Sequence, residues 1–101
     1  MRLRLHPEAA IEVTATAEWY DGESAGLGAV LLEELDRRFN SIIEMPLTWP
    51  LWPGISEELG VRRFLLDRFP FGVAYQVQTE EIQIIAVAHL KRRHGYWTSR
   101  T

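Results

Sequence analysis

The sequence predicts an α+β fold in which a two-helix hairpin packs on an antiparallel sheet of three to four strands. Two observations carry this prediction. Apolar residues recur at helical spacing through most of residues 7–43, whereas after residue 61 they alternate or run together as they do in strands. A further alternating segment at residues 2–5 adds a short strand before the helices. The expected order of elements is therefore β-α-α-β-β-β.

The composition is typical of one folded domain that spans residues 1–101. The length of 101 residues fits a single domain, and the apolar content of 47% argues against disorder. The absence of cysteine excludes disulfides and zinc–thiolate sites. No apolar run approaches the ~20 residues of a membrane span, and the first residues lack the apolar core of a signal peptide. We therefore expect a cytoplasmic protein without membrane contacts.

The net charge of −3 conceals an uneven distribution along the chain. Residues 1–61 contain four Arg and eleven Asp or Glu, a balance of −7, whereas residues 62–101 contain seven Lys or Arg and three Asp or Glu, a balance of +4. This asymmetry predicts an electropositive region that could contact an acidic partner, either nucleic acid or protein. The alternative is an acidic helical face that balances a basic sheet within one domain.

Each predicted helix has recognisable ends. His6-Pro7-Glu8 begins the first helix, because proline at the first helical position loses no needed donor. Asp21-Gly22 is expected to end it, with Gly22 in a left-handed cap. The second helix follows a short turn and extends from Leu27 to Ile43, antiparallel to the first. Its polar face is expected to carry the charged residues Glu33, Glu34, Asp36, Arg37 and Arg38.

The second half of the chain predicts a loop followed by strands. Three prolines in residues 46–54 exclude a regular helix or central strand, and we expect Trp49 and Trp52 to pack on the domain from this loop. Strands are predicted over Val61–Arg68, Phe71–Gln78 and Ile82–Ala88. The last is apolar on both faces and is therefore expected to be central. The candidate sheet edges are Leu3–Leu5 and Val61–Arg68.

Several motifs together resemble a known protein family. They are Arg62-Arg63-Phe64-Leu65-Leu66, Arg68-Phe69-Pro70-Phe71, Ala86-Val87-Ala88-His89 and Tyr96-Trp97, preceded in the first half by His6-Pro7-Glu8-Ala9-Ala10 and Trp19-Tyr20. In this order they resemble the RelE/ParE toxins of bacterial type II (plasmid-stabilisation) toxin–antitoxin systems, and in particular the ParE branch. The resemblance covers nearly the whole chain. It implies a helical hairpin on an antiparallel sheet, and a toxin neutralised by a cognate antitoxin in a hetero-oligomer.

The resemblance also implies a target. ParE members inhibit DNA gyrase by binding, whereas RelE members cleave mRNA, usually on the ribosome. Two features favour the non-catalytic ParE-like inhibitor. The pI of about 5.6 is low for a protein that docks among ribosomal phosphates. The segment from Glu33 to Leu59 also lacks the lysine cluster typical of RelE-type nucleases. The alternatives are a RelE-like, ribosome-dependent mRNA endonuclease and a non-toxic member that only binds an antitoxin.

Candidate site residues follow from these functions. If the protein is a nuclease, cations would stabilise the phosphate and proton donors would assist cleavage, which selects Arg62, Arg63, Arg68, His89 and Tyr96. The mixture of cations and aromatics near the C-terminus suggests a target-binding set of Arg68, Lys91, Arg92, Arg93, Tyr96, Trp97 and Arg100. No cofactor is expected, because a glycine-rich phosphate loop is absent. No metal is expected, because His6, His89 and His94 show no ligand spacing.

Each candidate also has a structural interpretation. Arg62 or Arg63 could pair with a helix carboxylate such as Glu33, Glu34 or Asp36. His89 could cap the sheet or form a hydrogen bond with Tyr96. Tyr96 and Trp97 could fix the C-terminal tail to the core, with Trp97 buried and Tyr96 half exposed.

Overall fold

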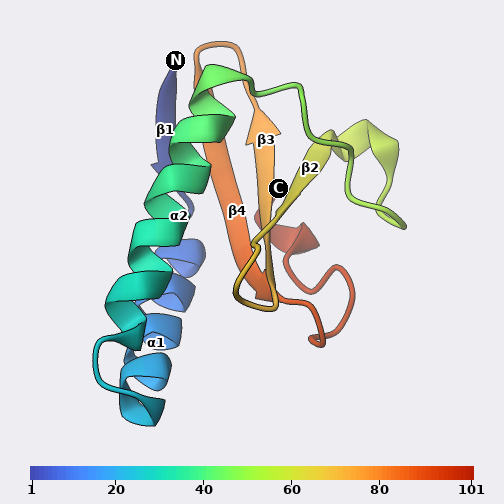
Figure 1. Ribbon diagram of the computed structural model, residues 1–101. Helices are drawn as coiled ribbons and strands as arrows, with labels where there is room; N and C mark the ends of the chain where they lie inside the picture. The colour runs from blue at the N-terminus through green and yellow to red at the C-terminus, as the bar shows by residue number, and fades with distance from the viewer.

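The computed structural model describes residues 1–101. Its single sheet has four strands, and both helices lie on one face of it (Figure 1). The elements in chain order are β1 (Arg2–Leu5), α1 (Pro7–Glu23), α2 (Leu27–Glu44), β2 (Val61–Leu65), β3 (Phe71–Val77) and β4 (Glu81–His89). Two short 3-10 helices, Glu57–Leu59 and Thr98–Arg100, lie in the connecting loop and the tail. The predicted α+β class and the predicted order of elements are confirmed.

The sheet has the strand order β1-β4-β3-β2 and is mixed rather than wholly antiparallel. β2, β3 and β4 form an antiparallel meander, but β1 pairs with β4 in parallel, with Leu3 opposite Ile82 and Leu5 opposite Ile84. The hairpin of α1 and α2 returns the chain to the end of the sheet where β1 begins, and three alternating strands follow. β4 therefore runs in the direction of β1. As predicted, β4 is central, and Ile82 and Ile84 are fully buried.

The turn between the helices differs from the prediction. α1 continues through Gly22 to Glu23, and the left-handed residue is Gly26, which precedes α2 with φ of 90°. Asp21 does not end the helix; its carboxylate instead accepts a 2.8 Å hydrogen bond from the backbone N–H of Gly28. Gly28 lies so close to α1 that a Cβ there would be 2.4 Å from the carbonyl oxygen of Ala17. The two helices therefore pack closely at this glycine.

The assignment of Glu34 to a polar helix face was wrong, because its side chain is fully buried. The predicted strand Val61–Arg68 was also too long, since β2 ends at Leu65 and the chain then turns over α2. This turn directs the backbone N–H of Asp67 at the Glu34 carboxylate, which accepts a 2.7 Å hydrogen bond. Arg38 pairs with both Glu34 and Asp67. The buried carboxylate thus satisfies a backbone donor of the turn that the sequence pattern could not reveal.

The two faces of the sheet are covered by different parts of the chain. Between the helices and the sheet lies a core that includes Leu31, Leu35 and Tyr75. The opposite face is covered by the proline-rich loop and the C-terminal tail, whose Trp52 and Trp97 rings pack edge to face at 5.1 Å. The predicted packing of the loop tryptophans is confirmed. Neither helix has the length and apolar character required to cross a membrane.

Candidate functional site

The residues proposed from the sequence do not form one cluster, and two of the arginines lie apart from the rest. Arg62 lies on the helix side of β2 and donates hydrogen bonds to the carbonyl oxygens of Trp49 at 2.7 Å and Leu47 at 3.4 Å. It pairs with no helix carboxylate, so that structural interpretation was wrong. Arg62 instead fixes the proline-rich loop. Arg68 is exposed in the turn between β2 and β3 and forms no ion pair.

The other three catalytic candidates, Arg63, His89 and Tyr96, meet around one small cavity on the opposite side of the sheet. This cavity, which we call the tail cavity, has a volume of about 140 Å³ and lies beneath the C-terminal tail. Its other polar walls are Arg92, Arg93 and His94. No aspartate or glutamate lines it.

The C-terminal tail is held by Glu12 of α1, a residue outside the sequence motifs. The Glu12 carboxylate accepts a 2.6 Å hydrogen bond from the hydroxyl of Tyr96. It also accepts two 3.0 Å bonds from the guanidinium of Arg100, and Arg92 lies 3.8 Å away. Trp97 is buried and Tyr96 half buried, as the structural interpretation predicted. Arg100, a target-binding candidate, is thus engaged within the protein.

The Glu12–Arg100 pair also occupies the position that a longer β1 would take beside β4. β1 ends at Leu5, opposite Ile84, and leaves the last part of β4 without a strand on that side. There the N–H of Val87 donates to Glu12 at 3.1 Å, and the carbonyl of Ile85 accepts from Arg100 at 3.1 Å. Because buried backbone groups require partners, this ion pair replaces strand hydrogen bonds. The sequence offered one signal for Glu12: it follows Ala9 by three residues and therefore lies on the same side of the helix. The structure shows that Ala9 is fully buried.

The electrostatics of this contact keep Tyr96 protonated. Burial raises the pKa of Tyr96, and the hydrogen bond to Glu12 and its negative charge raise it further, whereas Arg92 and Arg100 oppose the shift. Burial is the largest single effect on Arg100 and disfavours its charged form, but the hydrogen bond to Glu12 and the electrostatic interactions with Glu12, Tyr96 and Glu8 together raise the pKa of the guanidinium. The Tyr96 hydroxyl is therefore already used as a donor within the protein.

His89 is the last residue of β4 and forms two contacts there. Its Nδ1 accepts a 3.0 Å hydrogen bond from the backbone N–H of Lys91, and its ring packs edge-on against Phe71 at 5.0 Å. The interpretation of His89 as a cap at the sheet end is confirmed, and the proposed hydrogen bond to Tyr96 is absent. Lys91 and Arg93 remain exposed in the tail, where neither forms an ion pair.

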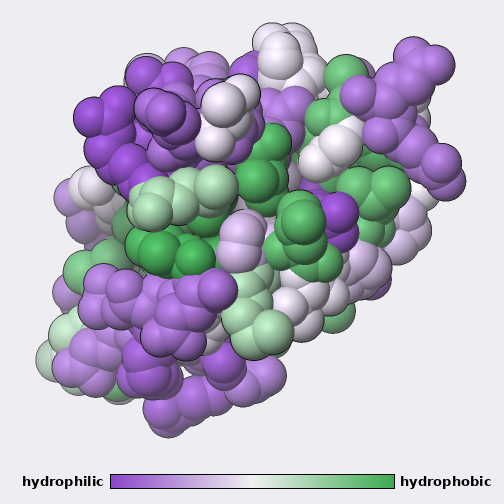
Figure 2. Space-filling view, turned by 90° about the horizontal axis from the view of Figure 1, so that it is seen from above, coloured by the Kyte–Doolittle hydropathy of each residue, from purple (hydrophilic) through white to green (hydrophobic).

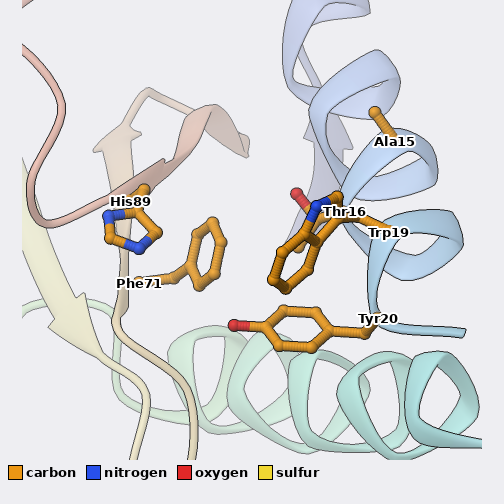
Figure 3. Close-up of a pocket in the computed structure, with 6 residues that line it drawn as sticks. All are labelled: Ala15, Thr16, Trp19, Tyr20, Phe71 and His89. Carbon is orange, nitrogen blue, oxygen red and sulfur yellow. The ribbon is translucent and has the colours of Figure 1, made fainter. Parts of the chain in front are cut away.

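A second feature of the surface is an apolar groove along α1, which we call the α1 groove. At one end, a pocket of about 320 Å³ lies between α1 and the sheet (Figure 3). The Trp19 and Phe71 rings face one another across it, with Tyr20 beside them. Beyond Ala15 the pocket opens onto a nearly flat stretch of the α1 surface, formed by α1 residues alone, that reaches Ile11. Ile11 and Trp19 are each 61% exposed, so this stripe of α1 is not covered by the domain's own core.

The two edges of the sheet differ in accessibility. The edge at β2 is covered by the proline-rich loop, since Trp52 N–H donates to the Val61 carbonyl at 2.7 Å. The outer edge of β1 pairs with no other strand, and its Arg2 and Arg4 side chains reach Glu81 of β4 at 3.4 and 3.0 Å. Viewed from above, hydrophobic groups gather in the centre of the surface between hydrophilic groups (Figure 2). No cluster of potential metal ligands is present.

Comparisons with known proteins support the fold. No family model matches the sequence, and no curated protein matches it. Among solved structures, the chain is similar to a chain described as "Chromosomal ParDE TA system from P. aeruginosa". The TM-score is 0.75 at 23% sequence identity, over 88% of this chain and 95% of that chain. The chain therefore has the fold of that ParDE component, as the resemblance implied.

Proposed function

We propose that this chain is the toxin of a type II toxin–antitoxin system and that a cognate antitoxin neutralises it by occupying the α1 groove. The observation that carries this proposal is the uncovered apolar stripe of α1 on a ParDE-like fold. Large apolar side chains that are exposed together on one face often mark a surface that a partner covers. Toxin and antitoxin would together form a hetero-oligomer in the cytoplasm.

The shape of the α1 groove suits an amphipathic segment. Ile11, Ala15 and Trp19 are spaced four residues apart along one face of α1, which matches the anchor spacing of a helix laid alongside it. The pocket between Trp19 and Phe71 could receive one large apolar side chain. The open edge of β1 offers a second contact by strand addition. Hydrogen exchange with the bound antitoxin should protect the groove, the β1 edge or both.

The proposed target is DNA gyrase, which the protein would inhibit by binding and without chemistry. The exposed cations Arg68, Lys91 and Arg93 are available for such a contact. The catalytic alternative is weakened because Arg62 holds the proline-rich loop and the Tyr96 hydroxyl is bound to Glu12. Trp97 is buried, so it would support this surface from beneath rather than contact the target.

The first test is induced expression in a bacterial host with and without the neighbouring small gene. Growth arrest with an induced DNA damage response, relieved by the neighbour's product, would support the gyrase-inhibiting toxin. Purified protein should then inhibit gyrase supercoiling. Absence of arrest would contradict the toxin proposal in that host and favour a non-toxic antitoxin-binding protein.

Placement of the antitoxin is tested separately with Ile11→Asp. A charge in the centre of the α1 groove should lower antitoxin affinity by about tenfold or more, because it must be desolvated in an apolar interface. Toxicity should persist, so the antitoxin should no longer rescue growth. The matched control is Leu32→Asp, which alters an exposed leucine of α2 outside the groove. Equal rescue of both variants would show that the antitoxin binds elsewhere.

The second candidate function is ribosome-dependent cleavage of mRNA. It is favoured by the tail cavity, which brings Arg63, His89 and Tyr96 together. Rapid loss of translation without a damage response, and cleavage of mRNA on ribosomes, would support it. Cleavage should then fall sharply in Tyr96→Phe. Cleavage that is unchanged in this variant would exclude Tyr96 as the proton donor.

A further inference from the structure

We propose that the segment bound in the α1 groove is a basic amphipathic helix. Its large apolar side chains would lie along the groove, and its lysine or arginine side chains would contact the carboxylates of α1. This inference rests on the proposed function, because it specifies the chemistry of the antitoxin segment that would occupy the groove. Two features carry it: an apolar side of α1 that the fold does not use, and unpaired negative charge along that side.

α1 has apolar residues on two sides, and only one of these sides faces the core. The inner side contributes the buried Ala17. The outer side carries Ile11 and Trp19, each 61% exposed, with Ala15 between them. At its Trp19 end the outer side opens into the pocket of about 320 Å³, whose opposite wall is Phe71 (Figure 3). Folding of the domain does not require this second apolar side, so it is available to a partner.

The carboxylates beside the outer side of α1 have no cations to balance them. α1 contains five acidic residues and no lysine or arginine. Glu18 and Glu23 are exposed and form no ion pair. Because residues three or four apart are neighbours on a helix, Glu18 lies beside Ala15 and Glu23 beside Trp19. A helix laid along the groove would therefore meet negative charge next to its apolar anchors.

The position of Glu18 and Glu23 near the end of α1 adds to this preference for cations. The C-terminal end of a helix carries partial negative charge on its free carbonyl groups, so carboxylates are unfavourable there and cations are favourable. The last turn of α1 has no basic residue. The two arginines that reach α1 from the tail, Arg92 and Arg100, both pair with Glu12. Lysine or arginine from a partner would stabilise this end of α1.

Shape and charge together select one kind of occupant. Nucleic acid or an anionic membrane would be repelled by the carboxylates. A symmetric dimer through the groove would place two acidic α1 helices against each other, and their like charges would repel. A basic amphipathic helix satisfies both requirements, because anchors spaced by three or four residues fit the groove. We expect its lysines or arginines three or four residues from the side chain that enters the pocket.

The first test measures binding of the whole chain to the purified product of the neighbouring small gene by titration calorimetry. Glu18→Lys should weaken binding about five- to tenfold, because an attractive contact becomes repulsive. Raising the ionic strength from about 0.05 M to about 0.5 M should also weaken binding. The matched control is Glu58→Lys, which makes the same change in net charge at an exposed, unpaired carboxylate outside the groove. Binding to this control should be unchanged.

A second test probes the groove without the antitoxin. Two synthetic helical peptides share leucine anchors at four-residue spacing, and beside the anchors one carries lysine and the other glutamate. The original protein should bind the lysine peptide more tightly than the glutamate peptide. In the double variant Glu18→Lys/Glu23→Lys this preference should reverse. Both substitutions are at exposed positions near the C-terminal end of α1, where lysine is favourable, so the variant should fold normally.

A weaker complex in Glu18→Lys than in Glu58→Lys, together with the reversed peptide preference, would support the inference. Loss of antitoxin binding in Ile11→Asp but not in Glu18→Lys would overturn it and leave the proposed function intact. Equal weakening in Glu18→Lys and Glu58→Lys would also overturn it, because the effect would then come from net charge alone. Self-association that Ile11→Asp abolishes would assign the groove to a second copy of the chain. Absence of growth arrest contradicts the proposed function, and the peptide preference still decides the charge of the segment that fits the groove.

Discussion

Replacement of Glu12 by glutamine should lower the free energy of unfolding by about 3 kcal/mol and loosen the C-terminal tail. The Glu12 and Arg100 side chains are only 13% and 14% exposed, and they share two hydrogen bonds of 3.0 Å. Glutamine retains one acceptor oxygen but loses the charge, so the Arg100 guanidinium remains partly buried without a counter-ion. Removal of one partner from a buried pair costs about 3–5 kcal/mol. Because the Glu12 and Arg100 side chains remain slightly exposed, we expect a loss at the lower end of this range.

Chemical denaturation followed by circular dichroism measures this loss. A decrease of about 3 kcal/mol corresponds to a fall in Tm of roughly 12–24 °C for a domain of this size. The matched control is Glu18→Gln on the same helix, because Glu18 is exposed and has no ion-pair partner. The control should remain within about 0.5 kcal/mol of the original protein. Equal stabilities of the two variants would refute the reasoning.

The effect should be transmitted through Arg100 and the tail. Hydrogen exchange should show faster exchange of the tail amides and of Val87, whose N–H donates to Glu12. A double-mutant cycle with Arg100→Gln should give a coupling energy of about 1–2 kcal/mol, since each substitution removes the same pair. Additive losses would show that Glu12 does not act through Arg100.

Two further predictions concern tyrosine ionisation and helix packing. Burial raises the pKa of Tyr75 to about 12 and raises that of Tyr96, so the folded protein binds more protons than the unfolded chain above pH ~10. The stabilisation from the two protonated tyrosines should be fully present below pH ~10 and should be lost as the pH rises, by up to ~1.4 kcal/mol per pH unit per tyrosine. Urea denaturation midpoints at about pH 9 and about pH 11 measure this loss. In Tyr75→Phe the free energy of unfolding should depend less steeply on pH. Gly28→Ala should destabilise the protein by roughly 2 kcal/mol or more, because its Cβ would collide with the Ala17 carbonyl. The matched control is Gly22→Ala, which has nothing within 4 Å of the added Cβ and should stabilise α1 by about 0.5–1 kcal/mol. Equal effects of Gly28→Ala and Gly22→Ala on stability would contradict the close approach of Gly28 to α1.

Several local features could be predicted because they depend on near neighbours in the chain. Pro7 at the first turn of α1 and the run of buried residues in β4 were readable from spacing alone. The packing of Trp49 and Trp52 on the domain could be predicted because the prolines around them exclude a regular helix or central strand and leave an ordered loop. The helix boundary at Gly22 was misjudged because its signal, a glycine after an aspartate, is also compatible with a helix that continues.

The candidate site was less predictable, because its chemistry depends on contacts between distant residues. Arg62 and Arg63 are adjacent in sequence, yet the alternation of β2 places them on opposite faces of the sheet and gives them unrelated partners. The sequence could not show which of them faces the tail cavity. Glu34 was expected on a polar helix face and Glu12 lay outside every motif, but each accepts a backbone N–H from a remote segment, at Asp67 and Val87.

The sequence by itself determined the fold class, the order of the elements and the central position of β4, because these follow from apolar spacing and from the chain terminators proline and glycine. The tertiary structure alone decided the parallel pairing of β1 with β4, and with it the incomplete edge that Glu12 and Arg100 close. It also left the Ile11–Trp19 stripe uncovered, although its spacing matches that of a buried face. The physical reason is that burial and hydrogen-bond satisfaction depend on which surfaces meet, and local sequence patterns do not contain that information.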